Sequence, residues 1–501
     1  MTNARRGPGL WADRLRIAVW AAVVILVVSP RLVGFTTDSD AYADVAANLL
    51  AGRGLVQTVV DFWRPGIPDP LGLWPPLFPM AIAALAALGV SLTTAARLVS
   101  ALGYVGFALA FHRLALRAGG RGFAFVTTIV VLLGPGLAQA GATAWSESLY
   151  LFLLTLALVS AYDLVHRPAP SSTPIPTAVG AGLLLGLAAD TRYVGIALLP
   201  LVGLLLWTSD ARRRVLAAWG AGALLPVALW LTHNLAAFGR LLGPGLPAGT
   251  RPLATVLREV LSALRWEFLP HAFAHIPWLA LPALLGVAAA VAWALGSRGA
   301  ARWAAWIALT QLACVVFAVW RSGINDAQGR YVLVAWPFLG LVVCAAARVA
   351  IERLFGGRRS ARVAEVSVAA LALLVVGAGL GRFVGTTVAP PAQAVARRHA
   401  QVALLQLAPR GDEPLLTDSG HLLRLTTGHS AVQVPPARFR VREFTAADAR
   451  RWRDRGVVRA LFRADNRAGL GPYLEARLSG GEGSWTVEDS AAGFVRYRIG
   501  P

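Results

Sequence analysis

The sequence predicts an all-α polytopic membrane protein with a small C-terminal α/β domain. Three observations favour this fold class. Of the 501 residues, 56% are apolar and only 15% are charged, and the mean hydropathy is +0.59, which is too apolar for a soluble chain of this length. Apolar runs separated by short arginine clusters extend to Phe383. From Val384 onward polar and apolar residues alternate, and we expect a buried strand at 415–417, a helix at 446–455 and a hairpin at 485–499. We therefore expect a transmembrane domain at 1–383 and a soluble domain at 384–501.

The distribution of charge along the chain indicates its membrane topology. The formal net charge is +21, and the basic residues are all arginine, because the chain contains no lysine. The arginines fall in clusters between apolar runs, a pattern that indicates the positive-inside rule and not a nucleic-acid surface. Cys314 and Cys344 both lie inside apolar runs, so we expect neither a disulfide framework nor a thiolate metal site.

The first apolar run sets the orientation. Ile17–Phe35 spans about 20 residues, is too long for a signal-peptide core and follows an arginine-rich start. It predicts a cytoplasmic N-terminus in a plasma-membrane protein, with the loop at 36–76, here called the first loop, outside. Leu77–Val90, at about 14 residues, is short for a span and is expected not to cross. The other spans are expected at 95–115, 123–139, 149–165, 178–189, 194–207, 215–235, 276–295, 303–320, 331–347 and 363–383, about eleven in all, which leaves the C-terminal domain extracytoplasmic.

The first loop begins with three carboxylates, Asp38, Asp40 and Asp44. Apolar residues at spacings of three and four follow them, which predicts a short amphipathic helix along the membrane interface with its acidic start facing water. Gly52 and Gly54 are expected to end this helix. Its apolar positions are Tyr42, Val45, Ala46, Leu49 and Leu50. The carboxylates of such a helix either take part in catalysis or are simply solvated at the membrane surface.

Further polar residues are expected on the same side of the membrane. Glu147 lies just before the predicted span at 149–165, Arg192 lies at the tip of a short hairpin, and Arg330 and Tyr331 close a tight loop. Acids beside arginines suit a reaction in which a carboxylate takes a proton from a hydroxyl while guanidinium groups hold a phosphate leaving group. The alternatives are a helix-start acid favoured by the helix dipole, a hairpin-tip charge and structural ion pairs.

Two weaker patterns concern metals and ligands. Glu267, His271 and His275 recur every four residues, the spacing that places ligands for a divalent metal on one helical face. Pro270 interrupts that helix, so interfacial histidines are the alternative and no cofactor is assigned. Trp74, directly before a double proline, stands where it could stack on a sugar or pack on a prenyl chain.

Several motifs in order resemble one family of membrane enzymes. After the acidic first loop come LWPPLFPMAIAAL, SESLYLFLLTLAL, GLLLGLAADTRYVGIALLP and GRYVLVAWP, which spread over most of Thr36 to Pro337. Together they are similar to the GT-C membrane glycosyltransferases of the protein O-mannosyltransferase and lipid A aminoarabinose-transferase type. The resemblance implies inverting transfer of a sugar, hexosyl or pentosyl, from a polyprenyl-phosphate donor to a glycan, lipid or protein acceptor in the cell envelope.

The resemblance also implies roles for individual residues. Asp38 looks like the loop acid that activates the acceptor hydroxyl, with Asp40 as the alternate, and Glu147 is similar to the second acid of the family. Arg192 and the Arg330–Tyr331 pair look like contacts to the donor phosphate. Tyr42 and Trp74 are the expected acceptor or sugar contacts.

The chain departs from the family pattern in two places. Many relatives have an Asp-Glu pair where this chain has Asp38-Ser39, and some have a lysine where this chain has Trp74. Two other function classes stay open, a lipid or glycolipid transporter and a non-catalytic protein of envelope assembly. A transporter is expected to carry ionisable residues deep within its spans, whereas most charges here lie at the ends of the apolar runs.

Overall fold

A computed structural model describes the chain at 8–29, 34–61, 66–166, 174–209, 213–244, 251–268, 277–321, 329–355, scattered positions between 366 and 381, 390–409, 412–434, 446–463, 485–491 and 494–499. It forms two compact units. The first comprises Met1–Gly34, Leu73–Phe78 and Arg97–Val388, and the second comprises Phe35–Gly72, Pro79–Ala96 and Ala389–Pro501.

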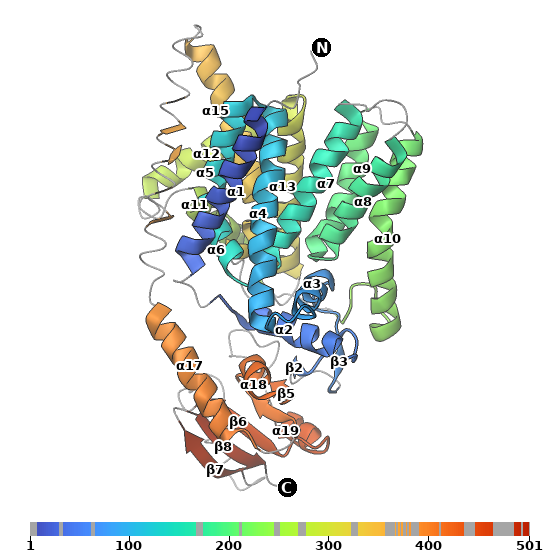
Figure 1. The fold of residues 1–501 in the computed structure, drawn as a ribbon, viewed down its shortest axis with the longest axis vertical. Coiled ribbons are helices and arrows are strands. Elements are labelled where there is room, and N and C mark those ends of the chain that lie inside the picture. Colours follow the sequence, from blue (N-terminus) through green and yellow to red (C-terminus); the bar gives the residue numbers. More distant parts are fainter. Residues whose placement is uncertain are drawn as a thin grey trace. The chain divides into compact units, whose positions relative to one another are not determined.

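The first unit is a bundle of apolar helices (Figure 1). Buried apolar side chains from almost all of these helices form one continuous core. The helices, in chain order, are α1 (Pro8–Val28), α4 (Leu92–Ala118), α5 (Arg121–Leu132), α6 (Pro135–Ala142), α7 (Glu147–His166), α8 (Pro174–Ala189), η2 (Tyr193–Ala197), α9 (Leu198–Trp207), α10 (Arg213–Phe238), α11 (Leu253–Phe268), α12 (Pro277–Gly296), α13 (Ala300–Arg321), α14 (Gly329–Val332) and α15 (Trp336–Phe355).

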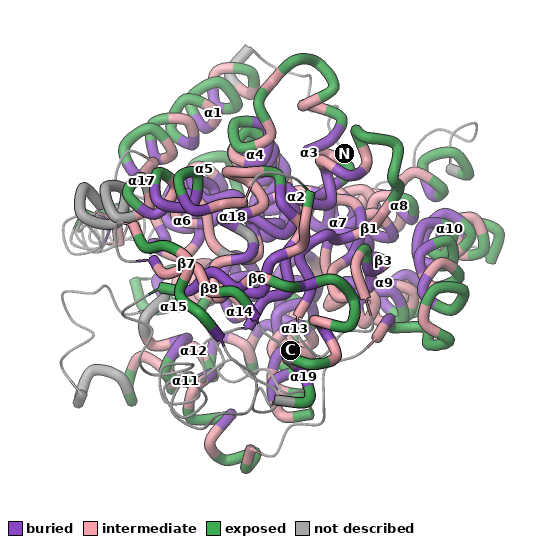
Figure 2. Tube along the Cα trace, turned by 90° about the horizontal axis from the view of Figure 1, so that it is seen from below, coloured by how far each residue is buried: buried purple, intermediate pink, exposed green. Residues whose placement is uncertain are grey.

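Among the described residues, four helices are long and apolar enough to cross a membrane: α4, α7, α10 and α13. A fifth span results if α5 and α6 count as one, although they are bent by 71° at the break between them. Gly134 precedes α6 and Pro135 opens it, so the predicted span at 123–139 is interrupted where proline lacks the N–H for a continuous helix. Figure 2 shows α10 with one exposed face, which carries Leu224, Leu225 and Leu229. The chain is an integral membrane protein.

Shorter apolar helices lie at three of the other predicted spans, and the count of about eleven spans stays a prediction. The pair predicted at 178–189 and 194–207 is α8 followed by η2 and α9, and the run predicted at 276–295 is α12. The stretch expected not to cross contains only α3 (Leu77–Ala86), of 10 residues. The last predicted span, at 363–383, lies largely outside the described residues.

Glycines allow α8 and α10 to pack with their backbones close together, and the two helices lie side by side in Figure 1. A Cβ atom at Gly182 would lie 2.0 Å from the carbonyl oxygen of Trp219, and one at Gly222 would lie 2.3 Å from that of Val179. Gly182 and Gly186 are spaced as in the small-xxx-small motif of membrane helix pairs. This packing fixes α8, and the turn that carries Arg192 follows its end.

The second unit is built on a six-stranded sheet. The order of its strands is β2-β5-β4-β6-β8-β7, in which β2, β5, β4 and β6 are parallel and β8 and β7 form an antiparallel hairpin. The strands are β2 (Val59–Asp61), β4 (Leu415–Thr417), β5 (Ala431–Gln433), β6 (Arg459–Arg463), β7 (Trp485–Ala491) and β8 (Phe494–Ile499). The strand predicted at 415–417 and the hairpin predicted at 485–499 are confirmed.

The parallel strands are buried on both faces, as continuous apolar runs require. On one face, Leu416 and Val432 pack with Trp452 of α19 (Ala446–Arg453). On the other face, Leu415 and Ala431 pack with side chains of α17 (Pro390–Leu407) and α18 (Gly420–Thr427). The predicted helix at 446–455 corresponds to α19.

One strand of this sheet comes from the first loop. β2 pairs in parallel with β5, so that Val59 lies opposite Ala431 and Val60 opposite Val432. The remaining strands of the first loop, β1 (Val56–Gln57) and β3 (Asp69–Pro70), pair with each other. The sheet of the soluble domain expected at 384–501 therefore includes a strand from the first loop, which lies within the transmembrane domain expected at 1–383.

We predict that Gly182→Leu lowers the unfolding temperature of the detergent-solubilised protein. Its side chain would collide with the backbone of Trp219 and force α8 and α10 apart, a change that costs about 1–3 kcal/mol in packed cores. Gly180→Leu is the matched control, because nothing lies within 4 Å of a Cβ atom at that position of the same helix. Equal unfolding temperatures for the two variants, measured by differential scanning fluorimetry, would contradict the packing described.

Candidate active site

In the first unit, the start of α7 is held in place by α4. The hydroxyl of Ser100 donates to the carbonyl oxygen of Trp145 (2.8 Å) and accepts from the Trp145 N–H (3.0 Å). A Cβ atom at Gly103 would lie 2.7 Å from the backbone nitrogen of Leu149, so the two backbones meet closely. α7 begins at Glu147, two residues before the predicted span at 149–165, and its first turn is held against α4.

Glu147 and Arg192, predicted separately as site residues, lie in contact. Nη1 of Arg192 is 2.7 Å from Oε1 of Glu147, whose side chain is only 1% exposed. The same nitrogen donates to the hydroxyl of Ser146 at 3.2 Å. The Arg192 side chain is 18% exposed, so the pair has one buried and one partly accessible member. A buried carboxylate opposite a guanidinium fixes the orientation of that arginine.

The turn that carries Arg192 is anchored by its neighbours. The hydroxyl of Tyr193 accepts hydrogen bonds from Nε1 of Trp230 (3.0 Å) and Nδ2 of Asn234 (3.3 Å), both on α10. The carbonyl oxygen of Asp190 accepts from the N–H of Leu77 at 2.9 Å. This bond joins the turn to the chain directly after Trp74 and the double proline, and Trp74 itself is half-buried.

Arg330 stacks on two aromatic rings. Its guanidinium carbon lies 5.4 Å from the ring centre of Trp145 and 5.1 Å from that of Tyr331. Nη2 of Arg330 also donates to the hydroxyl of Tyr331 at 3.4 Å. Aromatic contacts of this kind orient a guanidinium, and a planar guanidinium matches the geometry of a phosphate.

In the second unit, the predicted acidic helix is α2 (Thr37–Leu50). It ends before Gly52, which has a positive φ of 73°, as the glycines of the sequence predict. The expectation that its acids face water is wrong, because Asp40 is 4% exposed and Asp44 is 1% exposed. Asp38 is half-buried. Tyr42, expected to contact acceptor or sugar, is 6% exposed.

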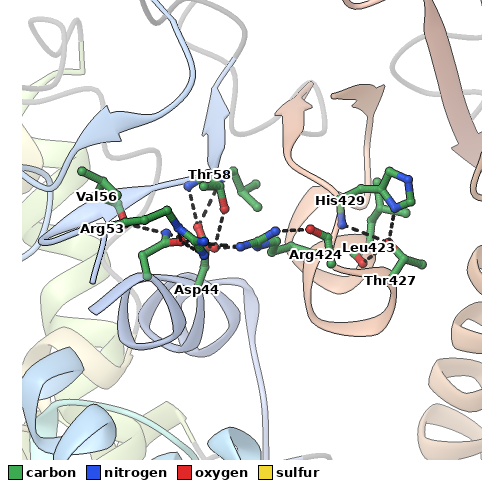
Figure 3. Close-up of polar contacts among 11 residues, drawn as sticks. Asp44, Arg53, Val56, Thr58, Leu423, Arg424, Thr427 and His429 are labelled. Carbon is green, nitrogen blue, oxygen red and sulfur yellow. Dashed lines mark hydrogen bonds and ion pairs between the residues drawn. The ribbon is translucent and has the colours of Figure 1, made fainter. Parts of the chain in front are cut away.

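Asp44 is the centre of a hydrogen-bonded network (Figure 3). Its Oδ2 accepts from the backbone N–H groups of Thr58 (2.7 Å) and Val59 (3.2 Å). Its Oδ1 accepts from the Thr58 hydroxyl (2.5 Å) and from Nε of Arg424 on α18 (3.0 Å). One carboxylate thus connects α2 to β2 and to α18, and solvation is not its role.

Ser39 helps to cap the start of α2. It is the third residue of α2, and its hydroxyl accepts from the N–H of the N-cap residue Thr36 at 3.0 Å. This is one half of a capping box, which satisfies an N–H group at the start of a helix. Where many relatives carry an acid, this chain has a residue that caps the helix of Asp38 and Asp40.

The comparison with solved structures identifies the fold. ArnT from Cupriavidus metallidurans bound to undecaprenyl phosphate matches over 98% of both chains, with a TM-score of 0.62 and 15% identity. The chain has the GT-C fold. The archaeal oligosaccharyltransferase AglB from Archaeoglobus fulgidus, in complex with an inhibitory peptide and a dolichol-phosphate, matches with a TM-score of 0.53 and 13% identity over 97% of this chain and 74% of that one.

Similarity extends to a third GT-C structure. The arabinofuranosyltransferase AftD from Mycobacteria matches with a TM-score of 0.56 and 18% identity, over 97% of this chain and 40% of that one. No protein-family model and no curated protein sequence matches the chain. At these identities the likeness concerns the fold, and the roles of individual residues remain predictions.

The remaining candidates concern metals. Within the described ranges, no group of three or more His, Cys, Asp or Glu side chains could hold a metal ion. His271 and His275 lie outside the described residues, and of Glu267 only the backbone, in α11, is described. The weak metal pattern at these three positions therefore stays a prediction.

Several residues have contacts or burial in the structure that the sequence did not predict. Arg397 and Arg424, in the C-terminal part of the chain, form ion pairs with Asp40 and Asp44 of α2. The sequence around each arginine shows only the alternation of polar and apolar residues and does not indicate its partner. Asn234 is fully buried in the apolar helix α10, and a lone amide in such a run was the available signal. Asp190 lies in the turn between the spans predicted at 178–189 and 194–207, and the sequence gives no sign of its burial.

Asp190 generates a prediction about pH. It lies in the turn beyond α8, is 8% exposed, and its burial raises its pKa from 3.8 to about 7. The folded state thus holds a proton that the unfolded state releases, so this group should make the protein less stable as the pH rises from about 4 to about 7. Asp190→Asn should remove that part of the pH dependence and raise the unfolding temperature above that of the native chain at pH 8.

Thermal unfolding in detergent between pH 4 and pH 8 checks this. Asp454→Asn is the control, because its carboxylate is 66% exposed beside Arg453. If the native and Asp190→Asn proteins show parallel profiles, Asp190 keeps an ordinary pKa and the explanation is wrong.

Proposed function

We propose that this protein is a membrane glycosyltransferase that transfers a hexosyl or pentosyl residue from a polyprenyl-phosphate donor to an acceptor hydroxyl of the cell envelope. The observation that carries the proposal is the match over 98% of both chains to ArnT bound to undecaprenyl phosphate. AglB, described with a dolichol-phosphate, adds a second GT-C structure with a polyprenyl-type phosphate. A lipid-linked donor also agrees with an integral membrane protein.

The arginines support the donor half of the reaction. A phosphate that leaves from the anomeric carbon gains negative charge as the bond breaks, and preorganised guanidinium groups stabilise that charge. Two arginines are such groups. Arg192 is oriented by Glu147, and the guanidinium of Arg330 contacts the rings of Trp145 and Tyr331. We assign both as contacts to the donor phosphate, with Trp74 as a contact to the sugar or the prenyl chain.

The acids of α2 support the acceptor half. In this proposal the acceptor oxygen attacks the anomeric carbon, the bond from that carbon to the phosphate oxygen breaks, and the acceptor proton passes to the carboxylate of Asp38. Asp40 is the less suitable base, because its carboxylate is 4% exposed and paired with Arg397. Tyr42 is buried in α2 and is assigned only as a neighbour of the acceptor site.

Topology completes the proposal. The arginine clusters support a cytoplasmic N-terminus, with the first loop and the C-terminal segment on the outer side of the plasma membrane. The donor headgroup would then be used on the outer leaflet. The acceptor is a glycan, lipid or protein exposed there.

We predict that purified native protein transfers radiolabelled sugar from a polyprenyl-phosphate donor and that Asp38→Asn lowers kcat by about 10²- to 10⁴-fold, the usual contribution of general base catalysis. Asp40→Asn should cost less, because that residue pairs with Arg397 and does not take the proton. Asp454→Asn, which removes an exposed carboxylate of the second unit, should transfer at the native rate.

Two outcomes would contradict the proposal. Native kcat in a correctly folded Asp38→Asn variant would remove Asp38 as the base. Binding of polyprenyl phosphate without transfer from any hexosyl or pentosyl donor would favour the transporter or envelope-assembly alternatives.

A further inference from the structure

Two arginines of the C-terminal segment (Ala389–Pro501) reach the same face of α2. Nη2 of Arg397 on α17 lies 2.9 Å from Oδ1 of Asp40, and Nε of Arg424 on α18 lies 3.0 Å from Oδ1 of Asp44. The two aspartates are four residues apart and so lie one turn apart on one side of the helix. The second unit therefore holds this face of α2 by two ion pairs.

Both ion pairs are largely removed from water. The aspartate side chains are 6% and 1% exposed, and those of Arg397 and Arg424 are 24% and 14% exposed. A buried carboxylate needs its partner charge, because removal of one partner leaves an uncompensated charge that costs far more than the pair contributes. Loss of either arginine is therefore expected to destabilise the position of α2.

Arg397 also contacts the chain just before the helix. Its guanidinium carbon lies 5.5 Å from the ring centre of Phe35, which precedes the N-cap residue Thr36. Arg397 thereby contacts the chain at Phe35, just before α2, and at Asp40, at the end of the first turn of α2. Asp38 is part of that turn, between the two points of contact.

We propose that Arg397 is a positioning residue that fixes Asp38 through Asp40, with Arg424 and Asp44 as a second anchor, so that the C-terminal segment is needed for the transfer step. The proposal rests on the function proposed above for Asp38. It gives the two neighbouring aspartates different tasks, because Asp40 anchors the helix and Asp38 takes the proton.

The test is a double-mutant cycle with Arg397→Gln, Asp40→Asn and the double variant in the full-length protein. We expect Arg397→Gln to lower kcat by about 10- to 100-fold, because small displacements of a catalytic group have effects of that size, with the KM for donor unchanged. The double variant should recover part of that loss, because neutralising both partners leaves no buried charge. The unfolding temperatures of the four proteins should show the same coupling.

Arg459→Gln is the matched control. Arg459 lies in β6 and forms ion pairs with Glu413 and Glu488, all within the C-terminal segment. Its loss should change kcat by less than about twofold, because neither of its partners lies in α2.

The outcomes separate the two proposals. If Asp40→Asn abolishes transfer in both backgrounds, Asp40 is itself the base and the positioning role is overturned. Additive unfolding temperatures across the cycle overturn it as well. If no donor supports transfer in the native protein, the proposed function fails, while the unfolding cycle still decides whether Arg397 anchors α2 through Asp40.

Discussion

The buried carboxylate of Asp44 is the constraint on which the second unit depends. Its two oxygens receive the backbone N–H groups of Thr58 and Val59, the Thr58 hydroxyl and the guanidinium of Arg424. A charge at 1% exposure is tolerated only when it is satisfied in this way. Satisfying it brings together a helix and a strand of the first loop and a helix that lies 380 residues further along the chain. The candidate acids of α2 therefore owe their placement to the C-terminal segment.

The arginines of this chain, which first indicate only membrane orientation, serve three different purposes. Some lie in clusters at helix ends, as the positive-inside rule expects. Arg192 and Arg330 are oriented by Glu147 and by aromatic rings, and both are proposed as contacts to the donor phosphate. Arg397 and Arg424 neutralise buried aspartates. A single side-chain chemistry, a delocalised charge with donors in one plane, suits all three tasks.

The sequence was informative where the pattern is local. Periodicity and end signals predicted α2 and the β7–β8 hairpin. Two kinds of feature escaped it. The three-residue strand β2 is too short to carry a pattern and is defined by its pairing with β5. The pair of Arg397 with Asp40 joins residues 357 positions apart, and nothing near either residue indicates the other. For this reason Asp40 and Asp44 were expected to face water although they are buried.

Hydrogen exchange of the native protein and of Asp44→Asn tests most directly whether Asp44 holds α2, β2 and α18 together. An amide in place of the carboxylate can accept on one side only, so it cannot serve both the Thr58 N–H and Arg424. We predict faster exchange in the substituted protein at 56–61 and also at 420–433, while α19 and β6, at 446–463, keep their native protection. Faster exchange confined to α2, or unchanged protection at 420–433, would contradict the account.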